Sequence, residues 1–171
     1  KTLRHTGSYL QGHPDMKHIP GVDMSSGSLG QGISAAVGMA IAGKLDNADY
    51  RVYTLLGDGE IQEGQVWEAA MLAAHQKLDN LVVIVDNNNL QIDGAIDEVN
   101  SPYPIDKKFE AFNFHVINID GNDFDQIDAA FKEAKTVKGC PTAIIAKTIK
   151  GKDVSFMENQ AGWHGKAPND E

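Results

Sequence analysis

Two short polar segments carry the residues whose chemistry is easiest to interpret. Asp58 lies in the segment GDGEIQEG, and Asn88 lies 30 residues later in the segment DNNNLQIDG. A carboxylate, a side-chain amide oxygen and a backbone carbonyl are hard oxygen ligands, and they suit an octahedral Mg²⁺ whose other ligands are water and phosphate oxygens. Gly59 would let the backbone approach an anion closely. We therefore predict a site for Mg²⁺ and a diphosphate.

Each of these segments is a weak signal alone, and the pair is a stronger one. Asp-Gly turns are common because glycine tolerates positive φ, and a run of asparagines is typical of a solvated loop. Here, however, each segment follows an apolar run, and one helical pattern separates the two. If the apolar runs are adjacent parallel strands, Asp58 and Asn88 meet at their carboxyl ends, where open α/β sheets bind ligands. A helix beginning near Gln65 would direct its free N–H groups to the same place.

The elements that must position these residues alternate along the chain. The first 26 residues are rich in Gly, His, Pro and Ser and predict a loop, whereas apolar residues recur every four positions over 29–45 and predict a helix. We predict further helices over 65–78 and 124–137, and strands in the runs RVYTLLG and LVVIV and over 114–119 and 142–147. This alternation predicts an α/β fold with a parallel sheet flanked by helices. The continuous apolar strands agree with burial on both faces.

Composition excludes several classes of function. The chain has 171 residues and a net charge of −9, which argues against nucleic acid or an anionic membrane as a partner. Its longest apolar runs, such as LVVIV, are far shorter than the roughly 20 residues of a membrane helix, and no signal peptide is visible. A single cysteine, Cys140, permits no internal disulfide and fits a reducing compartment. We expect one cytoplasmic globular domain.

The two segments and their neighbours resemble transketolases. GDG followed about thirty residues later by NN resembles the thiamine diphosphate signature, and GHPD, SGSLGQG, LLGDGEIQEG, DNNNLQIDG, AKTIKG and WHGKAP occur in that family's order and approximate spacing. The resemblance extends from about Arg4 to Pro168. It implies the thiamine diphosphate-binding fold, with residues 1–171 forming the diphosphate-binding (PP-type) domain, incomplete at both ends.

The resemblance implies cofactor and metal roles for individual residues. Mg²⁺ would be held by Asp58, Asn88 and the backbone carbonyl of Leu90, although Ca²⁺ or Mn²⁺ stays open. Of the cofactor residues, Glu63 would link the two cofactor sites of a dimer. The full set of implied thiamine diphosphate-binding residues is Gly27, Ser28, Leu29, Gly59, Glu63, Asn88, Ile92, Lys150 and His164.

His13 and His164 are the catalytic residues that the resemblance implies. His13 would lie beside the reacting carbon and bond the hydroxyls of the donor sugar, and His164 would shuttle protons near the diphosphate. Without the resemblance, His13 in a Gly-Pro loop is most often a surface residue, and His164 would be a mobile tail residue. The adjacent Trp163 argues mildly against a mobile tail, because a tryptophan usually needs a packing partner.

The activity implied is ketol transfer by two subunits together. A two-carbon unit would pass from a ketose phosphate to an aldose phosphate, as in the pentose phosphate pathway, with thiamine diphosphate and Mg²⁺. In the family a separate pyrimidine-binding domain supplies the glutamate and aromatic residues that bind the aminopyrimidine, and nothing in this sequence matches that domain. We therefore expect the N-terminal subunit of a split transketolase, active with a C-terminal, pyrimidine-binding subunit in a dimer or heterotetramer.

Other functions stay open at this point. A related thiamine enzyme, such as deoxyxylulose-phosphate synthase, dihydroxyacetone synthase or a transketolase for an unusual sugar, is the nearest. Asp15 and Ser26 stand where many relatives carry glutamate and threonine, which leaves the sugar undetermined. An inactive binding module is a second alternative, although the retained metal ligands and histidines speak against it. A Rossmann-type nucleotide binder is disfavoured, because no G-x-G-x-x-G follows a strand.

Overall fold

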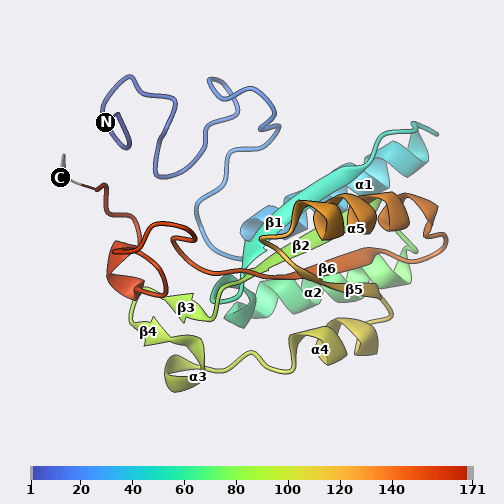
Figure 1. The fold of residues 1–171 in the computed structure, drawn as a ribbon. Coiled ribbons are helices and arrows are strands. Elements are labelled where there is room, and N and C mark those ends of the chain that lie inside the picture. The colour runs from blue at the N-terminus through green and yellow to red at the C-terminus, as the bar shows by residue number, and fades with distance from the viewer. Residues whose placement is uncertain (1, 169–171) are drawn as a thin grey trace.

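A parallel sheet forms the centre of the structure, a computed structural model that describes residues 2–168 (Figure 1). Its four strands lie in the order β1 (Val52–Gly57), β2 (Leu81–Asn87), β6 (Thr142–Lys147) and β5 (His115–Asp120). Neighbouring strands are parallel at every pairing in this sheet. The predicted α/β fold with a parallel sheet is confirmed.

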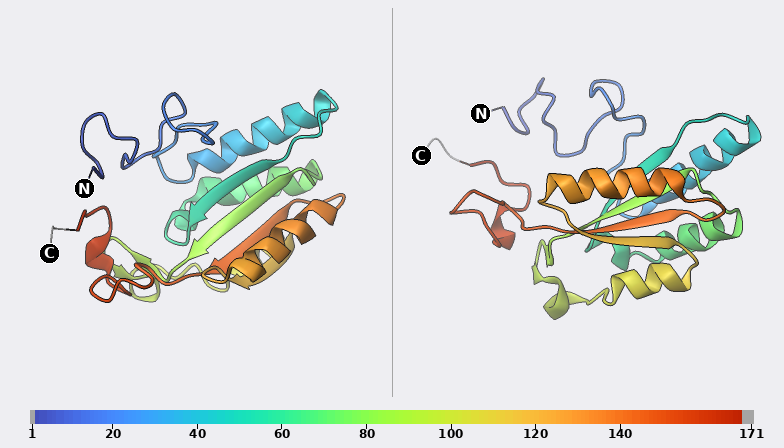
Figure 2. Two further views of the ribbon diagram at one scale, coloured as in Figure 1. Left: turned by 45° about the horizontal axis from the view of Figure 1, so that its top comes forward. Right: turned by 45° about the vertical axis from the view of Figure 1, so that its right-hand side comes forward.

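Helices pack on both faces of the sheet. On one face lie α1 (Gln31–Leu45), α2 (Gly64–His75) and α4 (Ile105–Ala111), whose buried side chains form one core with the strands. On the opposite face lies α5 (Phe124–Thr136), which packs on a smaller core (Figure 2). The two faces are therefore covered to different extents.

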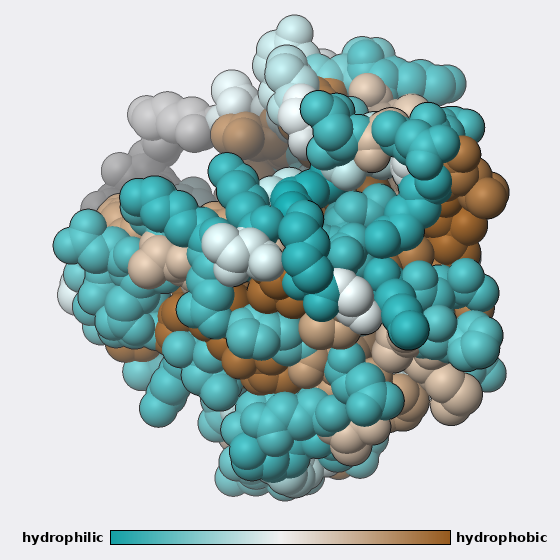
Figure 3. All heavy atoms as spheres, turned by 90° about the vertical axis from the view of Figure 1, so that its right-hand side faces the viewer, coloured by the Kyte–Doolittle hydropathy of each residue, from teal (hydrophilic) through white to brown (hydrophobic). Residues whose placement is uncertain are grey.

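The side chains of β2 show how the two cores are divided. Val83 and Val85 belong to the core beneath α1, α2 and α4, whereas Val82 belongs to the core beneath α5. Successive side chains of a strand point to opposite faces, so a continuous apolar run is buried on both sides, as predicted. The α5 face is less complete, since Leu55 of β1 remains 69% exposed. Seen from the amino ends of the strands, the surface is mostly hydrophilic, with apolar side chains in a few patches (Figure 3).

The long elements begin and end within three residues of their predicted positions. Short elements were not predicted, because two to seven residues are too few to establish a period. Besides α4, they are η1 (Glu60–Gln62), β3 (Leu90–Gln91), β4 (Gly94–Ala95), α3 (Ile96–Val99) and η2 (Ala161–Trp163). Most of them lie beyond the carboxyl ends of the strands, where the candidate site is.

Both ends of the described chain lie beyond the carboxyl ends of the strands (Figure 1). Residues 2–26 contain no helix or strand, as predicted, and the irregular segment continues to Gly30, because the helix predicted from Leu29 begins at Gln31. The two end segments touch, because Arg4 Nη1 donates a hydrogen bond of 2.7 Å to the carbonyl of Gly165. Among the helices in residues 2–168, none is long and apolar enough to cross a membrane.

Candidate functional site

Asp58 lies where the two polar segments meet. Strands β1 and β2 are adjacent, and Gly57 pairs with Asp86. Asp58 follows β1 directly and is 1% exposed. Its Oδ2 accepts hydrogen bonds from Asn87 Nδ2 at 3.0 Å and from the backbone N–H of Asn89 at 2.6 Å. The structure therefore brings the GDG turn and the asparagine segment together at one edge of the sheet.

The Asp58 carboxylate has no Lys, Arg or His ion-pair partner within residues 2–168. Burial raises the pKa of Asp58 above its usual value, and the nearby charge of Asp86 adds to that effect, although hydrogen bonds from neighbouring groups oppose it. Two carboxylates at one sheet edge repel each other, and a cation between them would relieve that repulsion. The electrostatics of the edge therefore suit a bound cation.

Asn88 is held in a fixed orientation beside this edge. Its Nδ2 donates to Asp86 Oδ2 at 3.1 Å, and its Oδ1 accepts from the backbone N–H of Leu90 at 3.0 Å. The Thr148 hydroxyl, just after β6, donates to the other oxygen of Asp86. An amide oxygen has two lone pairs, so Asn88 Oδ1 can accept this bond and also bind a metal.

The donor set fits Mg²⁺ by its chemistry. It combines one carboxylate, one amide oxygen and one backbone carbonyl, all oxygen ligands, and leaves room for phosphate and water. In residues 2–168 no group of three or more His, Cys, Asp or Glu side chains is arranged to hold a metal. The predicted set does not require such a group, because Asp58 is its sole member of those four types.

The glycine-rich loop before α1 lies against the same edge. The backbone N–H of Gly30 donates to Glu60 Oε1 at 3.0 Å. Gly30 has φ of +80°, and a Cβ placed on it would lie 2.8 Å from the Cβ of Glu63. Both the left-handed backbone and the close approach require glycine at this position. The predicted cofactor loop, residues 27–29, is thereby placed beside Glu63 and the GDG turn.

His13 packs against this cofactor loop. A Cβ at Gly27 would lie 3.0 Å from His13 Cγ and 3.2 Å from Nδ1, so a larger residue at Gly27 would push the imidazole away. The His13 side chain is exposed, which leaves its ring nitrogens accessible. The structure thus joins a predicted catalytic histidine to a predicted cofactor segment.

Other predicted site residues lie on separate segments. Ile92 is exposed between β3 and β4, and His164 is exposed just after η2. Within residues 2–168 no hydrogen bond or ion pair joins His164 to Asp58 or to His13. The segments that carry the two predicted catalytic histidines nevertheless meet at Arg4, which donates to the carbonyl of Gly165 and whose guanidinium carbon lies 3.5 Å from a Cβ placed on Gly12.

Trp163 fixes the segment that carries His164. Its Nε1 donates to the carbonyl of Phe156 at 2.9 Å, and the two rings meet edge to face with centroids 5.4 Å apart. Lys166 lies over the Trp163 ring, 5.1 Å from its centroid. Phe156 is therefore the packing partner expected for the tryptophan. His164 directly follows the short helix η2, which these contacts hold in place.

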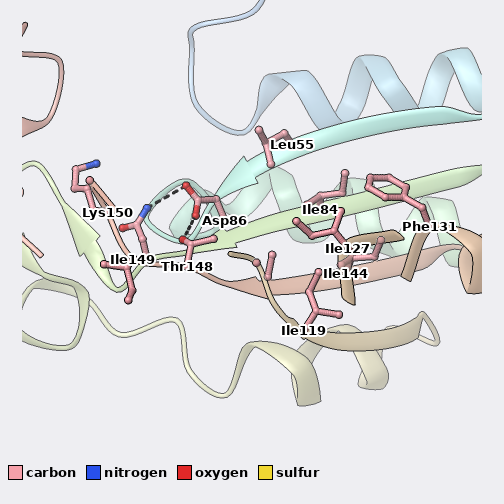
Figure 4. Close-up of a pocket in the computed structure, with 14 residues that line it drawn as sticks. Leu55, Ile84, Asp86, Ile119, Ile127, Phe131, Ile144, Thr148, Ile149 and Lys150 are labelled. Atoms are coloured by element: carbon pink, nitrogen blue, oxygen red, sulfur yellow. Dashed lines mark hydrogen bonds between the residues drawn. The ribbon is translucent and has the colours of Figure 1, made fainter. Parts of the chain in front are cut away.

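A cavity of about 480 Å³ opens from the site toward α5 (Figure 4). Its polar end contains Asp86 and Thr148, with Lys150 as the cationic group beside them. Its apolar part lies between β1, β2 and α5 and includes Leu55 and Phe131. Lys150 therefore lines the end of the cavity at which Asp86 and Thr148 lie (Figure 4).

Several residues that support the site were not predicted from the sequence. Asn87, not Asn88, bonds the Asp58 side chain, and Asn87 Nδ2 also donates to Tyr103 Oη at 2.6 Å. Burial raises the pKa of Tyr103, and the charge of Asp58 contributes to this shift. The alternation of side chains along β2 was the available signal, since it directs Asn87 away from the face shared by Asp86 and Asn88.

Comparison with known proteins finds relatives among the transketolases. The sequence matches the family described as transketolase, thiamine diphosphate binding domain, over residues 1–171. It is 47% identical over 163 residues to the 6-deoxy-6-sulfo-D-fructose transketolase subunit SqwG of Clostridium sp. strain MSTE9, covering 95% of this chain and 59% of that protein. It is 44% identical over 170 residues to a subunit of the apulose-4-phosphate transketolase of Phocaeicola vulgatus, covering 99% of this chain and 60% of that one. The chain thus spans about 60% of the length of these relatives.

Solved structures agree with the sequence relatives. The transketolase of Campylobacter jejuni superposes with a TM-score of 0.84 at 37% identity, covering 94% of this chain and 26% of that chain. The R525L mutant transketolase of Pichia stipitis gives a TM-score of 0.81 at 32% identity, covering 94% of this chain and 25% of that chain. The chain therefore shares both sequence and fold with these enzymes.

Proposed function

The chain belongs to the transketolase thiamine diphosphate-binding family, and from this premise we propose that it is part of the N-terminal subunit of a split transketolase. Residues 1–171 would form a large part of its diphosphate-binding domain. The assembled enzyme would transfer a two-carbon ketol unit from a ketose phosphate to an aldose phosphate. The observation that carries the proposal is the buried Asp58 carboxylate, which lies against the asparagine segment without a cationic partner in residues 2–168.

Asp58, Asn88 and the carbonyl of Leu90 would hold Mg²⁺. The N–H of Gly59 donates to Asp58 Oδ1 at 2.9 Å in this structure, and it would bond the diphosphate instead when the cofactor is bound. When bound, thiamine diphosphate supplies the nucleophilic carbon that accepts and passes on the two-carbon unit. Lys150 would add positive charge beside the phosphates, consistent with its place at the polar end of the cavity. The chain's own contribution is to bind and orient these charged groups.

The proposed histidines would act on the sugar. His13, packed on Gly27 and exposed, would bond hydroxyls of the donor and take up or return their protons. Histidine suits this role because its usual pKa is near neutrality. His164 would do the same near the diphosphate. Gly27, Ser28, Leu29 and Ile92 would line the cofactor by backbone and apolar contacts.

The proposed partner is a pyrimidine-binding subunit. Three of the relatives are named as transketolase subunits, which supports a second polypeptide. Glu63 would reach toward the neighbouring cofactor site in a dimer or heterotetramer. We propose the cytoplasm as the location, which the single cysteine fits.

A transketolase for an unusual sugar is the second candidate. Two of the relatives are named for 6-deoxy-6-sulfo-D-fructose and for apulose 4-phosphate, so proteins similar to this chain include enzymes outside the usual pentose and hexose phosphates. Both candidates use the same cofactor site and differ in the sugar. A role in the pentose phosphate pathway therefore belongs to the first candidate alone.

The test uses the full-length polypeptide purified with its natural partner. Ketol transfer between xylulose 5-phosphate and ribose 5-phosphate is assayed with thiamine diphosphate and Mg²⁺, and we expect activity that a chelator and Asp58→Ala both abolish. Asp49→Ala is the matched control, because Asp49 is exposed. Bound cofactor without this activity would favour the unusual sugar. Activity without the partner would contradict the split enzyme, and absence of both binding and activity would favour an inactive module.

A further inference from the structure

We propose that Glu60 is a positioning residue that holds the cofactor loop, residues 27–29, against the end of β1. The proposal rests on the function proposed above, because that function makes residues 27–29 a cofactor segment. Glu60 begins η1 and is half-buried. It is not among the residues expected to touch cofactor, metal or sugar, so its role would be exerted through the backbone that it binds.

The Glu60 carboxylate joins two segments that are distant in the sequence. Its Oε1 accepts the backbone N–H of Gly30 at 3.0 Å, and its Oε2 accepts the backbone N–H of Gly57 at 3.1 Å. Gly30 directly follows the cofactor loop, and Gly57 directly precedes Asp58. Hydrogen bonds to an ionised carboxylate are roughly twice as strong as neutral ones. One side chain therefore sets the distance between the cofactor loop and the GDG turn.

The start of α1 depends on this carboxylate. Gly30 is the N-cap of α1 and carries no side chain that could cap the helix. A negative charge near a helix N-terminus is favourable, and Glu60 accepts the N–H of the N-cap residue itself, as the glutamate of a capping box does. Among the hydrogen bonds of residues 2–168, the bond from Gly30 to Glu60 is the one that ties residues 27–30 to the sheet edge.

Both carboxylate oxygens of Glu60 accept bonds from backbone N–H groups, which affects how this carboxylate interacts with a nearby diphosphate. A free carboxylate beside a diphosphate would repel it, whereas a carboxylate that accepts two backbone bonds has part of its charge satisfied. Loss of the charge at Glu60 would free the loop without removing any group that touches the cofactor. The expected defect is therefore weaker cofactor binding rather than altered chemistry.

The experiment compares wild type with Glu60→Gln in the full-length polypeptide assembled with its partner. Titration calorimetry with thiamine diphosphate at saturating Mg²⁺ gives the Kd, which we expect to rise about tenfold in Glu60→Gln. Hydrogen exchange on the cofactor-free protein gives the second readout, and we expect faster exchange in the peptides that contain Gly30 and Gly57. Glutamine keeps the shape of the side chain but offers one acceptor where the carboxylate offers two.

Two controls separate positioning from general destabilisation. Asp79→Asn changes another carboxylate that accepts a backbone N–H, that of Gly139 at 2.9 Å, at the opposite end of the sheet. It should lower stability without changing the Kd or the exchange of the Gly30 peptide. Glu98→Gln, at an exposed glutamate of α3, should change none of the three: the stability, the Kd or the exchange of the Gly30 peptide.

The outcomes decide between the alternatives. A Kd within twofold of wild type would overturn the proposal, whatever the exchange shows. If Glu60→Gln fails to fold, Glu60→Asp replaces it, because the shorter carboxylate keeps the charge but cannot reach both glycines, and the same two readouts apply. If the wild type binds no thiamine diphosphate, the proposed function is overturned and the positioning role with it. Unchanged exchange in Glu60→Gln, when the wild type does bind the cofactor, would overturn the positioning role alone.

Discussion

Asp58 and Asp79 lie at opposite ends of the same pair of strands and have opposite surroundings. Asp79 precedes β2, where Lys44 Nζ lies 2.6 Å from its Oδ1 and the N–H of Gly139 donates to its Oδ2. Partial burial of Asp79 raises its pKa, but the Gly139 bond and the Lys44 charge outweigh burial, and the net pKa is lowered. Asp58 follows β1, accepts three hydrogen bonds and still has a raised pKa, because its burial is deeper and the nearest charge is negative.

The difference is the one expected between a structural carboxylate, Asp79, and a proposed metal ligand, Asp58. At the amino ends of the strands every partner of Asp79 lowers the free energy of the ionised form. At the carboxyl ends the chain holds an anionic group with no ion-pair partner among residues 2–168. Perturbed pKa values gather at functional sites, where a ligand completes the electrostatics. Mutation at each end can test whether the two roles are separable.

The largest effect is expected from Asp58→Asn. Affinity for thiamine diphosphate with Mg²⁺ should fall about 100-fold or more, because the proposed metal ligand would lose its charge. Stability without metal should change by about 1 kcal/mol or less, since relief of a buried charge offsets one lost hydrogen-bond acceptor. Calorimetry measures the affinity, and urea unfolding of the cofactor-free protein measures the stability.

The pH dependence of Asp58→Asn gives an independent check. A carboxyl with a raised pKa in the folded state binds more protons when folded, so wild-type stability falls as pH rises from 3.8 through that raised pKa. The variant lacks this contribution, so its free energy of unfolding should increase relative to that of the wild type as pH rises. A variant that keeps full cofactor affinity would remove Asp58 from the metal site.

Asp79→Asn should have a smaller effect than Asp58→Asn, and it should lower stability while leaving cofactor affinity nearly unchanged. We expect the free energy of unfolding to fall by about 1 to 2 kcal/mol at neutral pH, because the Lys44 pair and a charge-assisted bond are both weakened. The folded pKa is lowered, so this contribution is present above the unfolded pKa and disappears as pH falls through the folded one. Urea unfolding across pH should therefore show the variant and wild type converging in acid, while cofactor affinity stays within twofold. A large loss of cofactor affinity in Asp79→Asn would contradict the separation of a structural carboxylate at the amino ends from a binding site at the carboxyl ends.

Much of the framework could be predicted from the sequence, because apolar periodicity reflects burial. The run LVVIV lies in β2 with side chains buried on both faces, and the helical patterns were found in place. The meeting of Asp58 with the asparagine segment was predictable as well, since consecutive parallel strands joined by a helix tend to be neighbours. Roles for His13 and His164, in contrast, came from the resemblance, because irregular loops carry no period.

The contacts that support the site could not be predicted in the same way. Glu60 accepts bonds from Gly30 and Gly57, and neither spacing nor residue type indicates that pairing. The choice of Asn87 over Asn88 as the partner of Asp58 follows from the alternation of side chains along β2 once the end of that strand is known. The contacts of Glu60, in contrast, are fixed by the three-dimensional course of turns, which local patterns do not encode.

The smallest effect is expected at Lys77, which lies at the amino-end side of the sheet after α2. Lys77 has φ of +51°, its N–H bonds the carbonyl of Ala74, and the N–H of Leu78 bonds that of Ala73, which closes the helix. A left-handed conformation is costly for a residue with a Cβ and free for glycine. Lys77→Gly should therefore raise the free energy of unfolding by about 0.5 to 1 kcal/mol in urea unfolding, without any change in cofactor affinity. Lys77→Ala keeps the Cβ and should give no such gain, so an equal gain in both variants would assign the effect to the lysine side chain instead of the backbone.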